Sequence, residues 1–196
     1  MLQIDSQDIP AITTALREHQ IVALPTETVY GLAVSLTSKP AIKKLIKLKS
    51  RDIDSGKYFT LVPESISAIS QYAHITPLAK KIIKLAVPGE VTLILPKNPN
   101  FTHFYYDQID TIGVRIPNHP LFQKLLPLSG PLLLTSANLS GAVPAQNLSE
   151  VSSALPSFLT VVKGETGGHQ PSTVIDCTSA EPKVLRQGDF ILSSVL

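Results

Sequence analysis

The chain has 196 residues, of which 43% are hydrophobic and 16% charged, and its formal net charge is only +2. This composition is that of an ordinary globular protein and excludes an intrinsically disordered chain. The balanced charge does not by itself indicate a nucleic-acid binder, so any positive site must arise from local clustering. The single cysteine, Cys177, excludes an intramolecular disulfide and a cysteine-rich zinc site, and we expect it to be a small buried hydrophobe.

The length of the chain favours one well-buried domain over residues 1–196. The N-terminal stretch has neither the basic start nor the apolar core of a signal peptide. No apolar run approaches the ~20 residues that a membrane helix needs. We therefore expect a cytoplasmic protein with no membrane partner.

Short apolar runs rich in β-branched residues alternate with helical patterns along the whole chain. The predicted strands lie near residues 21–24, 31–36, 59–62, 91–95, 111–116, 131–135, 158–162, 172–176 and 183–186. Such alternation predicts an α/β or mixed α+β layered domain. Neither a repeat nor a proline- or glycine-rich linker divides the chain, so the sequence predicts no domain boundary.

Three helices are predicted between these strands, beginning at Ser38, Thr76 and His119. The first has an apolar stripe at Ile42, Leu45 and Ile46. The second is expected to carry Leu78, Ile82 and Leu85 on one face and to end at Pro88–Gly89. The third is expected to be shorter.

Two of the apolar runs end in small polar side chains. Residues 21–24 lead into Pro25-Thr26-Glu27-Thr28, and the segment 131–141 reads PLLLTSANLSG. In α/β sheets, ligands bind at the edge where strands end. Both segments are therefore expected at a ligand site.

The common nucleotide and metal motifs are absent from the sequence. Ser55-Gly56-Lys57 lacks the first glycine and the following hydroxyl residue of a phosphate loop, and the glycines of 163–172 have the wrong spacing for a dinucleotide fingerprint. The histidines are not paired as metal ligands, so no protein-held metal is predicted. The segment 163–172 is expected to be a mobile loop beside the ligand.

Two groups of cations stand close to the predicted strands. Arg115 lies inside a strand-like run, where a guanidinium must either pair with an acid or reach a ligand carboxylate, and both alternatives stay open. Lys49 and Arg51 follow the first predicted helix, and in isolation they would be a solvated basic helix end.

Seven motifs in one order resemble those of the YrdC family of threonylcarbamoyl-AMP synthases. They are Pro25–Gly31, Lys49 with Arg51, Pro88–Leu95, Gly113–Pro117, Thr135–Gly141, Ser172–Asp176 and Leu185–Gly188. The resemblance implies a single three-layer domain whose twisted mixed sheet curves around a positively lined groove. Because the sequence ends eight residues after Gly188, it resembles the short form of the family.

The resemblance also implies a reaction. L-threonine, bicarbonate or carbon dioxide, and ATP would give threonylcarbamoyl-AMP and pyrophosphate. The product would serve the modification of adenosine 37 in tRNA by a separate tRNA-threonylcarbamoyl transferase machinery. Magnesium would be held mainly through the phosphate oxygens of ATP.

The same resemblance assigns roles to individual residues. Lys49 and Arg51 would be the catalytic cations. The ATP site would consist of Lys49, Arg51, Ser136, Asn138 and Arg186, and the threonine site of Thr28, Tyr30, Arg115, Ser172 and Thr173. Glu27 is expected to have a structural or hydrogen-bonding role and not to be a general base.

The segment after Arg51 differs from the usual family pattern. Its Ser-Gly-x-x-Phe-Thr-Leu sequence resembles the YciO branch, and Asp52 and Asp54 place negative charges beside the predicted phosphate cations. Those acids would either weaken triphosphate binding or help to hold magnesium. Two alternatives therefore stay open: a YciO-like nucleotide-binding paralogue, and a double-stranded RNA or tRNA-binding module that uses the basic residues of 39–51.

Overall fold

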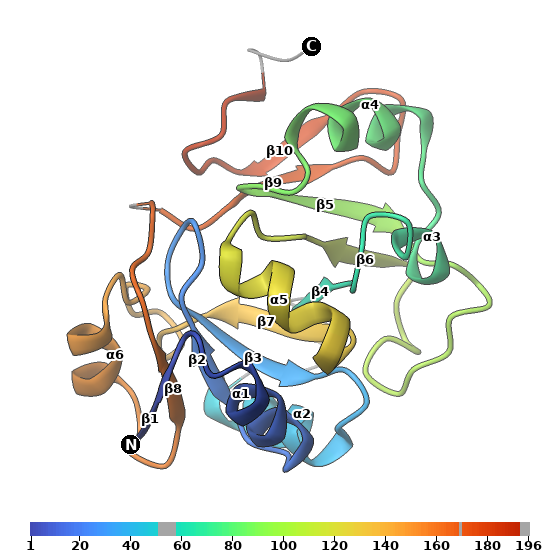
Figure 1. Cartoon of the computed structure of the whole chain (residues 1–196). Coiled ribbons are helices and arrows are strands. Elements are labelled where there is room, and N and C mark those ends of the chain that lie inside the picture. The colour runs from blue at the N-terminus through green and yellow to red at the C-terminus, as the bar shows by residue number, and fades with distance from the viewer. Residues whose placement is uncertain (51–57, 169, 193–196) are drawn as a thin grey trace.

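The computed structural model describes residues 1–50, 58–168 and 170–192, and these residues form a ten-stranded mixed sheet (Figure 1). The spatial order of the strands is β1-β8-β2-β3-β7-β4-β6-β5-β9-β10. In chain order they are β1 (Leu2–Asp5), β2 (Val22–Leu24), β3 (Gly31–Ser35), β4 (Thr60–Val62), β5 (Val91–Pro96), β6 (Thr111–Val114), β7 (Leu132–Ser136), β8 (Thr160–Lys163), β9 (Thr173–Asp176) and β10 (Lys183–Arg186).

The strand pairing confirms the predicted mixed sheet. β8 pairs in parallel with β1 and β2, β4 with β6, and β5 with β9, whereas the remaining pairs are antiparallel. Each of the nine predicted regions contains a strand. The sequence did not predict β1, because only Ile4 of its four residues is buried and no apolar run marks it.

The helices are α1 (Ile9–Arg17), α2 (Lys39–Leu48), α3 (Ile69–Tyr72), α4 (Pro77–Ala86), α5 (Pro120–Ser129) and α6 (Leu148–Ala154). The three predicted helix starts are confirmed by their caps. The side chains of Ser38 and Thr76 accept hydrogen bonds from N–H groups three residues further on, and His119 caps α5 in the same way from two residues away.

Two details of the predicted helices are wrong. Leu85 is 56% exposed, because the buried face of α4 turns toward Ile83. α5 has ten residues, as many as α2 and α4, so it is not shorter. The sequence also did not predict α1, α3 and α6, the last two of which have only four and seven residues.

Helices cover both faces of the sheet and complete the predicted three layers. Ile42 and Leu45 of α2 and Ile82 of α4 belong to one buried apolar cluster, and α1 and α5 pack against each other on the opposite face (Figure 1). α1 and α5 cover that second face over β2, β3 and β7. Over β5, β6 and β9 the same face lines a cavity.

Cys177 lies in the first apolar cluster and is fully buried, which confirms its expected structural role. Burial raises the pKa of its thiol to about 11, and the charge of Asp176 adds to this effect. None of the helices in the described part of the chain combines the length and the apolar character needed to cross a bilayer.

Candidate active site

The cavity lies in the middle of the sheet and has a volume of about 540 Å³. This is the size of many small-molecule binding sites. Three neighbouring strands contribute three threonines, a glycine and one isoleucine to its lining: Thr60, Thr92, Ile94, Thr111 and Gly113. Because side chains alternate between the two faces of a strand, Thr92 and Ile94 of β5 face the cavity while Leu93 enters the core.

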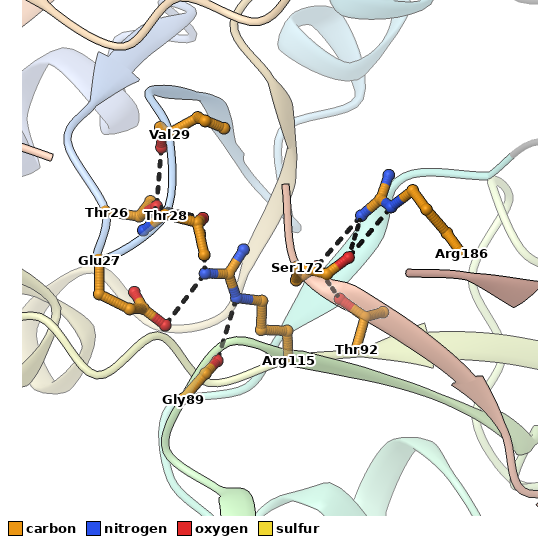
Figure 2. Close-up of polar contacts among 9 residues, drawn as sticks. All are labelled: Thr26, Glu27, Thr28, Val29, Gly89, Thr92, Arg115, Ser172 and Arg186. Carbon is orange, nitrogen blue, oxygen red and sulfur yellow. Dashed lines mark hydrogen bonds and ion pairs between the residues drawn. The ribbon is translucent and has the colours of Figure 1, made fainter. Parts of the chain in front are cut away.

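Arg115 follows β6 directly and forms one end of the cavity. It is 7% exposed. Its Nε donates to the carbonyl oxygen of Gly89 at 3.3 Å, and its Nη2 donates to Glu27 Oε1 at 3.0 Å and to Thr28 Oγ1 at 2.9 Å (Figure 2). Arg115 thus pairs with an acid and also lines the cavity, so the two alternatives left open by the sequence do not exclude each other.

The hydroxyl groups beside Arg115 have a fixed direction of hydrogen bonding. Thr26 Oγ1 donates its only proton to the carbonyl oxygen of Val29 at 2.7 Å. In the 2.8 Å contact between Thr26 Oγ1 and Thr28 Oγ1, the donor must therefore be Thr28. Thr28 accepts from Arg115 and donates to Thr26, so the segment after β2 and the guanidinium hold each other in place.

Arg186, at the end of β10, reaches the same end of the cavity from the other side. Its Nε and Nη2 donate to the carbonyl oxygen of Ser172 at 3.0 and 2.7 Å, and Nη2 lies 3.2 Å from Ser172 Oγ. Ser172 Oγ also contacts Thr92 Oγ1 at 2.8 Å. Desolvation, and then the charge of Arg115, lower the pKa of the Arg186 guanidinium from its usual value.

We call the group of Thr28, Arg115, Ser172 and Arg186 the arginine end of the cavity. Figure 2 shows the two guanidinium groups on either side of Ser172. Two cations from different segments that line the same cavity favour the binding of an anionic group.

The glycine-rich segment predicted as a ligand-side loop lies against the arginine end. A Cβ atom at Gly167 would come within 2.9 Å of the carbonyl oxygen of Glu27, and one at Gly188 would clash with the carbonyl oxygen of Pro171. Pro171 and Ser172 at the end of the loop line the cavity, so this end of the loop lies beside the candidate site. Its mobility stays a prediction, and His169 lies outside the described residues.

Lys49, Ser136 and Asn138 form a second polar group, which we call the lysine knot. Lys49 is 4% exposed, and its Nζ donates to the carbonyl oxygens of Ser136 and Asn138 at 3.1 and 2.8 Å and to Asn138 Oδ1 at 2.7 Å. Ser136 Oγ donates to the same Oδ1 at 2.7 Å. Ser136 lines the cavity, whereas Lys49 and Asn138 are not part of the lining. The knot ties the end of α2 to the loop after β7.

The remaining predicted residues have different positions. Tyr30 lines the cavity, but its hydroxyl contacts the carbonyl oxygens of Val162 and Gly164, and burial raises its pKa to about 12. Thr173 faces away from the cavity and donates to the carbonyl oxygen of Phe190 at 2.8 Å. Arg51 belongs to residues 51–57, which lie outside the described residues.

The cavity therefore brings together six predicted site residues: Thr28, Tyr30, Arg115, Ser136, Ser172 and Arg186. Sequence reasoning missed Thr92 and Asp176, which also line it. The alternation of side chains along a strand could have indicated both residues. Positions 172, 174 and 176 lie on one face of the β9 segment, and position 92 lies on the same face of β5. Asp176 Oδ1 accepts from the N–H and the hydroxyl of Thr178 at 2.9 and 2.7 Å.

Glu27 has the hydrogen-bonding role expected of it, but only one of its oxygens is used. Oε1 binds Arg115, and Oε2 is buried without a hydrogen-bond partner in the described part of the chain. A buried acceptor without a partner costs about 1–3 kcal/mol. The fold therefore keeps this acid at a cost in stability.

Comparisons with known proteins agree on one family. The family model Sua5/YciO/YrdC, whose description is "Telomere recombination", matches residues 14–188. A protein named threonylcarbamoyl-AMP synthase from Vibrio parahaemolyticus is 33% identical over 183 residues, which cover 90% of this chain and 97% of the relative.

Two solved structures of the same family are also similar along nearly the whole chain. P. abyssi Sua5 complexed with L-threonine has a TM-score of 0.87 and 31% identity, over 99% of this chain and 58% of Sua5. The chain thus spans little more than half the length of Sua5. E. coli YciO has a TM-score of 0.86 and 26% identity, over 100% of this chain and 97% of YciO.

Proposed function

The chain belongs to the Sua5/YciO/YrdC family, and from this premise we propose that it is a threonylcarbamoyl-AMP synthase, the function named for its curated relatives. It would convert L-threonine, bicarbonate or carbon dioxide, and ATP into threonylcarbamoyl-AMP and pyrophosphate. The product would pass in the cytoplasm to the transferase machinery that modifies adenosine 37 of tRNA.

The observation that carries this proposal is that two guanidinium groups, those of Arg115 and Arg186, line one cavity of about 540 Å³ together with Ser172, which Arg186 binds. The substrates are an amino acid with a carboxylate and a nucleotide with a triphosphate, so both need cationic partners. A neutral or acidic cavity would not support this chemistry.

The arginine end suits the carboxylate of threonine. Nε and both N–H groups of Nη2 of Arg115 are already used by Gly89, Glu27 and Thr28. The carboxylate would therefore bind Nη1, helped by Ser172, instead of a fork of two nitrogens. Arg186 would approach the phosphates of the nucleotide.

The other predicted ATP-binding residues fall into two kinds. Ser136 lines the cavity and would contact the nucleotide directly. Lys49 and Asn138 would act by holding Ser136 in place at the end of β7. Arg51 stays a predicted phosphate cation.

The proposed chemistry needs no nucleophilic side chain. The neutral amine of threonine attacks the carbon of carbon dioxide and releases a proton to solvent, and an oxygen of the resulting carbamate attacks the α phosphorus, from which pyrophosphate leaves. Catalysis would consist of positioning and of charge stabilisation on the leaving pyrophosphate. Holding reactants in line can supply about 7–11 kcal/mol.

Magnesium fits the cavity as an ion carried by the nucleotide. Asp176 is the carboxylate that lines the cavity among the described residues, and its Oδ2 has no partner there. One carboxylate together with phosphate oxygens and water is a common magnesium environment. Asp176 would hold the ion, which would neutralise charge on the phosphates.

The test is release of pyrophosphate by the purified protein supplied with ATP, magnesium, L-threonine and bicarbonate. We expect release that needs both threonine and bicarbonate, and a product with the mass of threonylcarbamoyl-AMP. Release at the same rate without threonine would contradict the proposed function.

A second candidate is a YciO-like nucleotide binder, which the similarity to E. coli YciO along the whole chain favours. ATP binding without threonine-dependent pyrophosphate release would support it. The alternative of a double-stranded RNA or tRNA-binding module has a separate test, since tRNA binding that weakens steeply with salt and needs no ATP would favour it.

A further inference from the structure

The arginine end leaves only one nitrogen of Arg115 for a ligand. A guanidinium has five N–H groups, one on Nε and two on each Nη. Glu27 and Thr28 take the two N–H groups of Nη2, and Gly89 takes the one on Nε. Nη1 has no hydrogen-bond partner among the residues that the structure describes, and Figure 2 shows it directed toward the space between Thr28 and Ser172.

Two acidic side chains, Glu27 and Glu90, interact electrostatically with Arg115. The pKa of Glu90 is raised by desolvation first and then by the charges of Asp189 and Glu27, while Arg115 lowers it. Glu27 and Glu90 therefore share the electrostatic environment of Arg115. Glu27 makes the ion pair with Arg115, whereas the Glu90 side chain makes no hydrogen bond to it.

Two arginines on either side of a hydroxyl would also suit a phosphate group. During the proposed reaction ATP and pyrophosphate are present in the cavity. A phosphate group of either could therefore occupy the site of the threonine carboxylate. The attraction between a site and a ligand grows with the charge of each. Cancelling one positive charge of the site therefore weakens the binding of a multiply charged anion more than the binding of a single carboxylate.

We propose that Glu27 is a positioning and specificity-determining residue, which turns Nη1 of Arg115 toward the cavity and cancels one positive charge of the arginine end. Arg115 then accepts the carboxylate of an amino acid and rejects pyrophosphate, whereas Arg186 remains available to the phosphates of the nucleotide. This inference rests on the proposed function and deepens it, because it names what keeps the two substrate classes apart.

The buried oxygen of Glu27 supports this role. Oε2 has no partner in the described residues, so the acid is not retained for a complete set of hydrogen bonds of its own. Two properties explain why the fold keeps Glu27: Oε1 pairs with Arg115, and the carboxylate carries a negative charge.

The experiment measures binding of L-threonine and of pyrophosphate by calorimetry in the wild type and in Glu27→Gln. The variant keeps the size of the side chain and removes its charge. We expect threonine to bind about 10-fold more weakly, since Nη1 is no longer held in place, and pyrophosphate to bind about 5-fold more tightly. Pyrophosphate should then compete with threonine in the variant, and only with ATP in the wild type.

Glu90→Gln is the matched control. It removes an acid from the same environment but no hydrogen bond to Arg115. Both dissociation constants should stay within about 2-fold of the wild type. Equal changes in the two variants would overturn the inference, because they would reflect bulk charge and not the contact of Glu27.

Two further measurements keep the inference falsifiable if Glu27→Gln does not fold. Glu27→Asp keeps the charge and shortens the side chain, so threonine binding should weaken without a gain for pyrophosphate. In the wild type, competition between pyrophosphate and threonine would overturn the inference directly.

The same titrations separate the inference from the proposed function. If the wild type does not bind L-threonine, the proposed function fails and the inference fails with it. If the wild type binds L-threonine and Glu27→Gln binds it equally well, only the inference fails.

Discussion

The arginine end and the lysine knot both contain a cation that lies in a family motif and is buried in the fold, yet they use it differently. Arg115 is 7% and Lys49 is 4% exposed. Arg115 lines the cavity and leaves Nη1 facing it. Lys49 does not line the cavity and donates hydrogen bonds to one oxygen of Ser136, at the end of β7, and to two of Asn138 in the following loop.

The difference follows from the number of donors. An ammonium has three N–H groups, and three protein oxygens accept from that of Lys49. A guanidinium has five, so Arg115 can bind Gly89, Glu27 and Thr28 and still offer two to a ligand. A cation in a motif can therefore either hold the backbone around the site in place or contact the ligand. The number of protein acceptors around it determines which of the two it does.

The largest effect is expected for Arg115→Met, which removes the proposed partner of the threonine carboxylate and leaves Glu27 unpaired. Threonine-dependent pyrophosphate release should fall at least ~100-fold, which corresponds to ~2.7 kcal/mol of transition-state stabilisation. The measurement is the rate at saturating ATP over a range of threonine concentrations.

Arg115→Lys is the control for charge. It keeps a cation but cannot bind Gly89, Glu27 and Thr28 and still offer Nη1, so its activity should lie between those of the wild type and of Arg115→Met. A rate for Arg115→Met close to that of the wild type would break the comparison, because Arg115 would then be structural.

A smaller effect on activity and a clear effect on stability are expected for Lys49→Met. Three oxygens would each lose a hydrogen bond from a charged donor, so the free energy of unfolding should fall by ~2–4 kcal/mol in urea titrations. Pyrophosphate release should fall at least ~10-fold through the displaced Ser136 loop. The KM for threonine should stay unchanged, because the arginine end is intact.

Lys47→Met is the matched control, since Lys47 is an exposed lysine in the last turn of the same helix. Its free energy of unfolding should stay within ~0.5 kcal/mol of the wild type. If Lys49→Met loses activity while its stability is unchanged, Lys49 contacts the nucleotide. The lysine knot would then use its cation to bind a ligand, as the arginine end does.

The sequence predicted most of the sheet and much of the cavity for simple physical reasons. Apolar runs mark buried strands, and Ser38 and Thr76 are capping residues whose role does not depend on the tertiary structure. It was harder to predict on which face of a strand a single side chain lies. Ser172 and Thr173 are neighbours in one motif, but strand alternation puts the first in the cavity and the second behind it.

Side-chain contacts between segments far apart in the chain could not be predicted from the sequence. Nothing in the chain near Glu27 indicates that its partner is Arg115, 88 residues away. Likewise, the burial of Lys49 follows from the loop after β7, which lies 87 residues further on. Leu85 is the opposite case, because its apolar character predicted burial that the packing of α4 does not provide.

The smallest effect concerns the charge around the arginine end and is expected for Glu90→Gln. The pKa of Glu90 is raised above 4.5, chiefly by desolvation, so its ionised form is less favourable in the folded than in the unfolded chain. This penalty is present at neutral pH and disappears as the pH falls below 4.5, where the carboxyl is protonated in both states. The variant should therefore be more stable than the wild type at neutral pH, by less than ~1 kcal/mol, and equally stable in acid.

Repeating this measurement in a Glu27→Gln background sharpens the comparison. Glu27 is one cause of the raised pKa of Glu90, so the gain from Glu90→Gln should be smaller once Glu27 is neutral. In a Lys49→Met background the gain should keep its full size, because the arginine end still contains Glu27. The same gain in all three backgrounds would mean that the charge of Glu27 does not reach Glu90, and the arginine end would then not behave as one electrostatic unit.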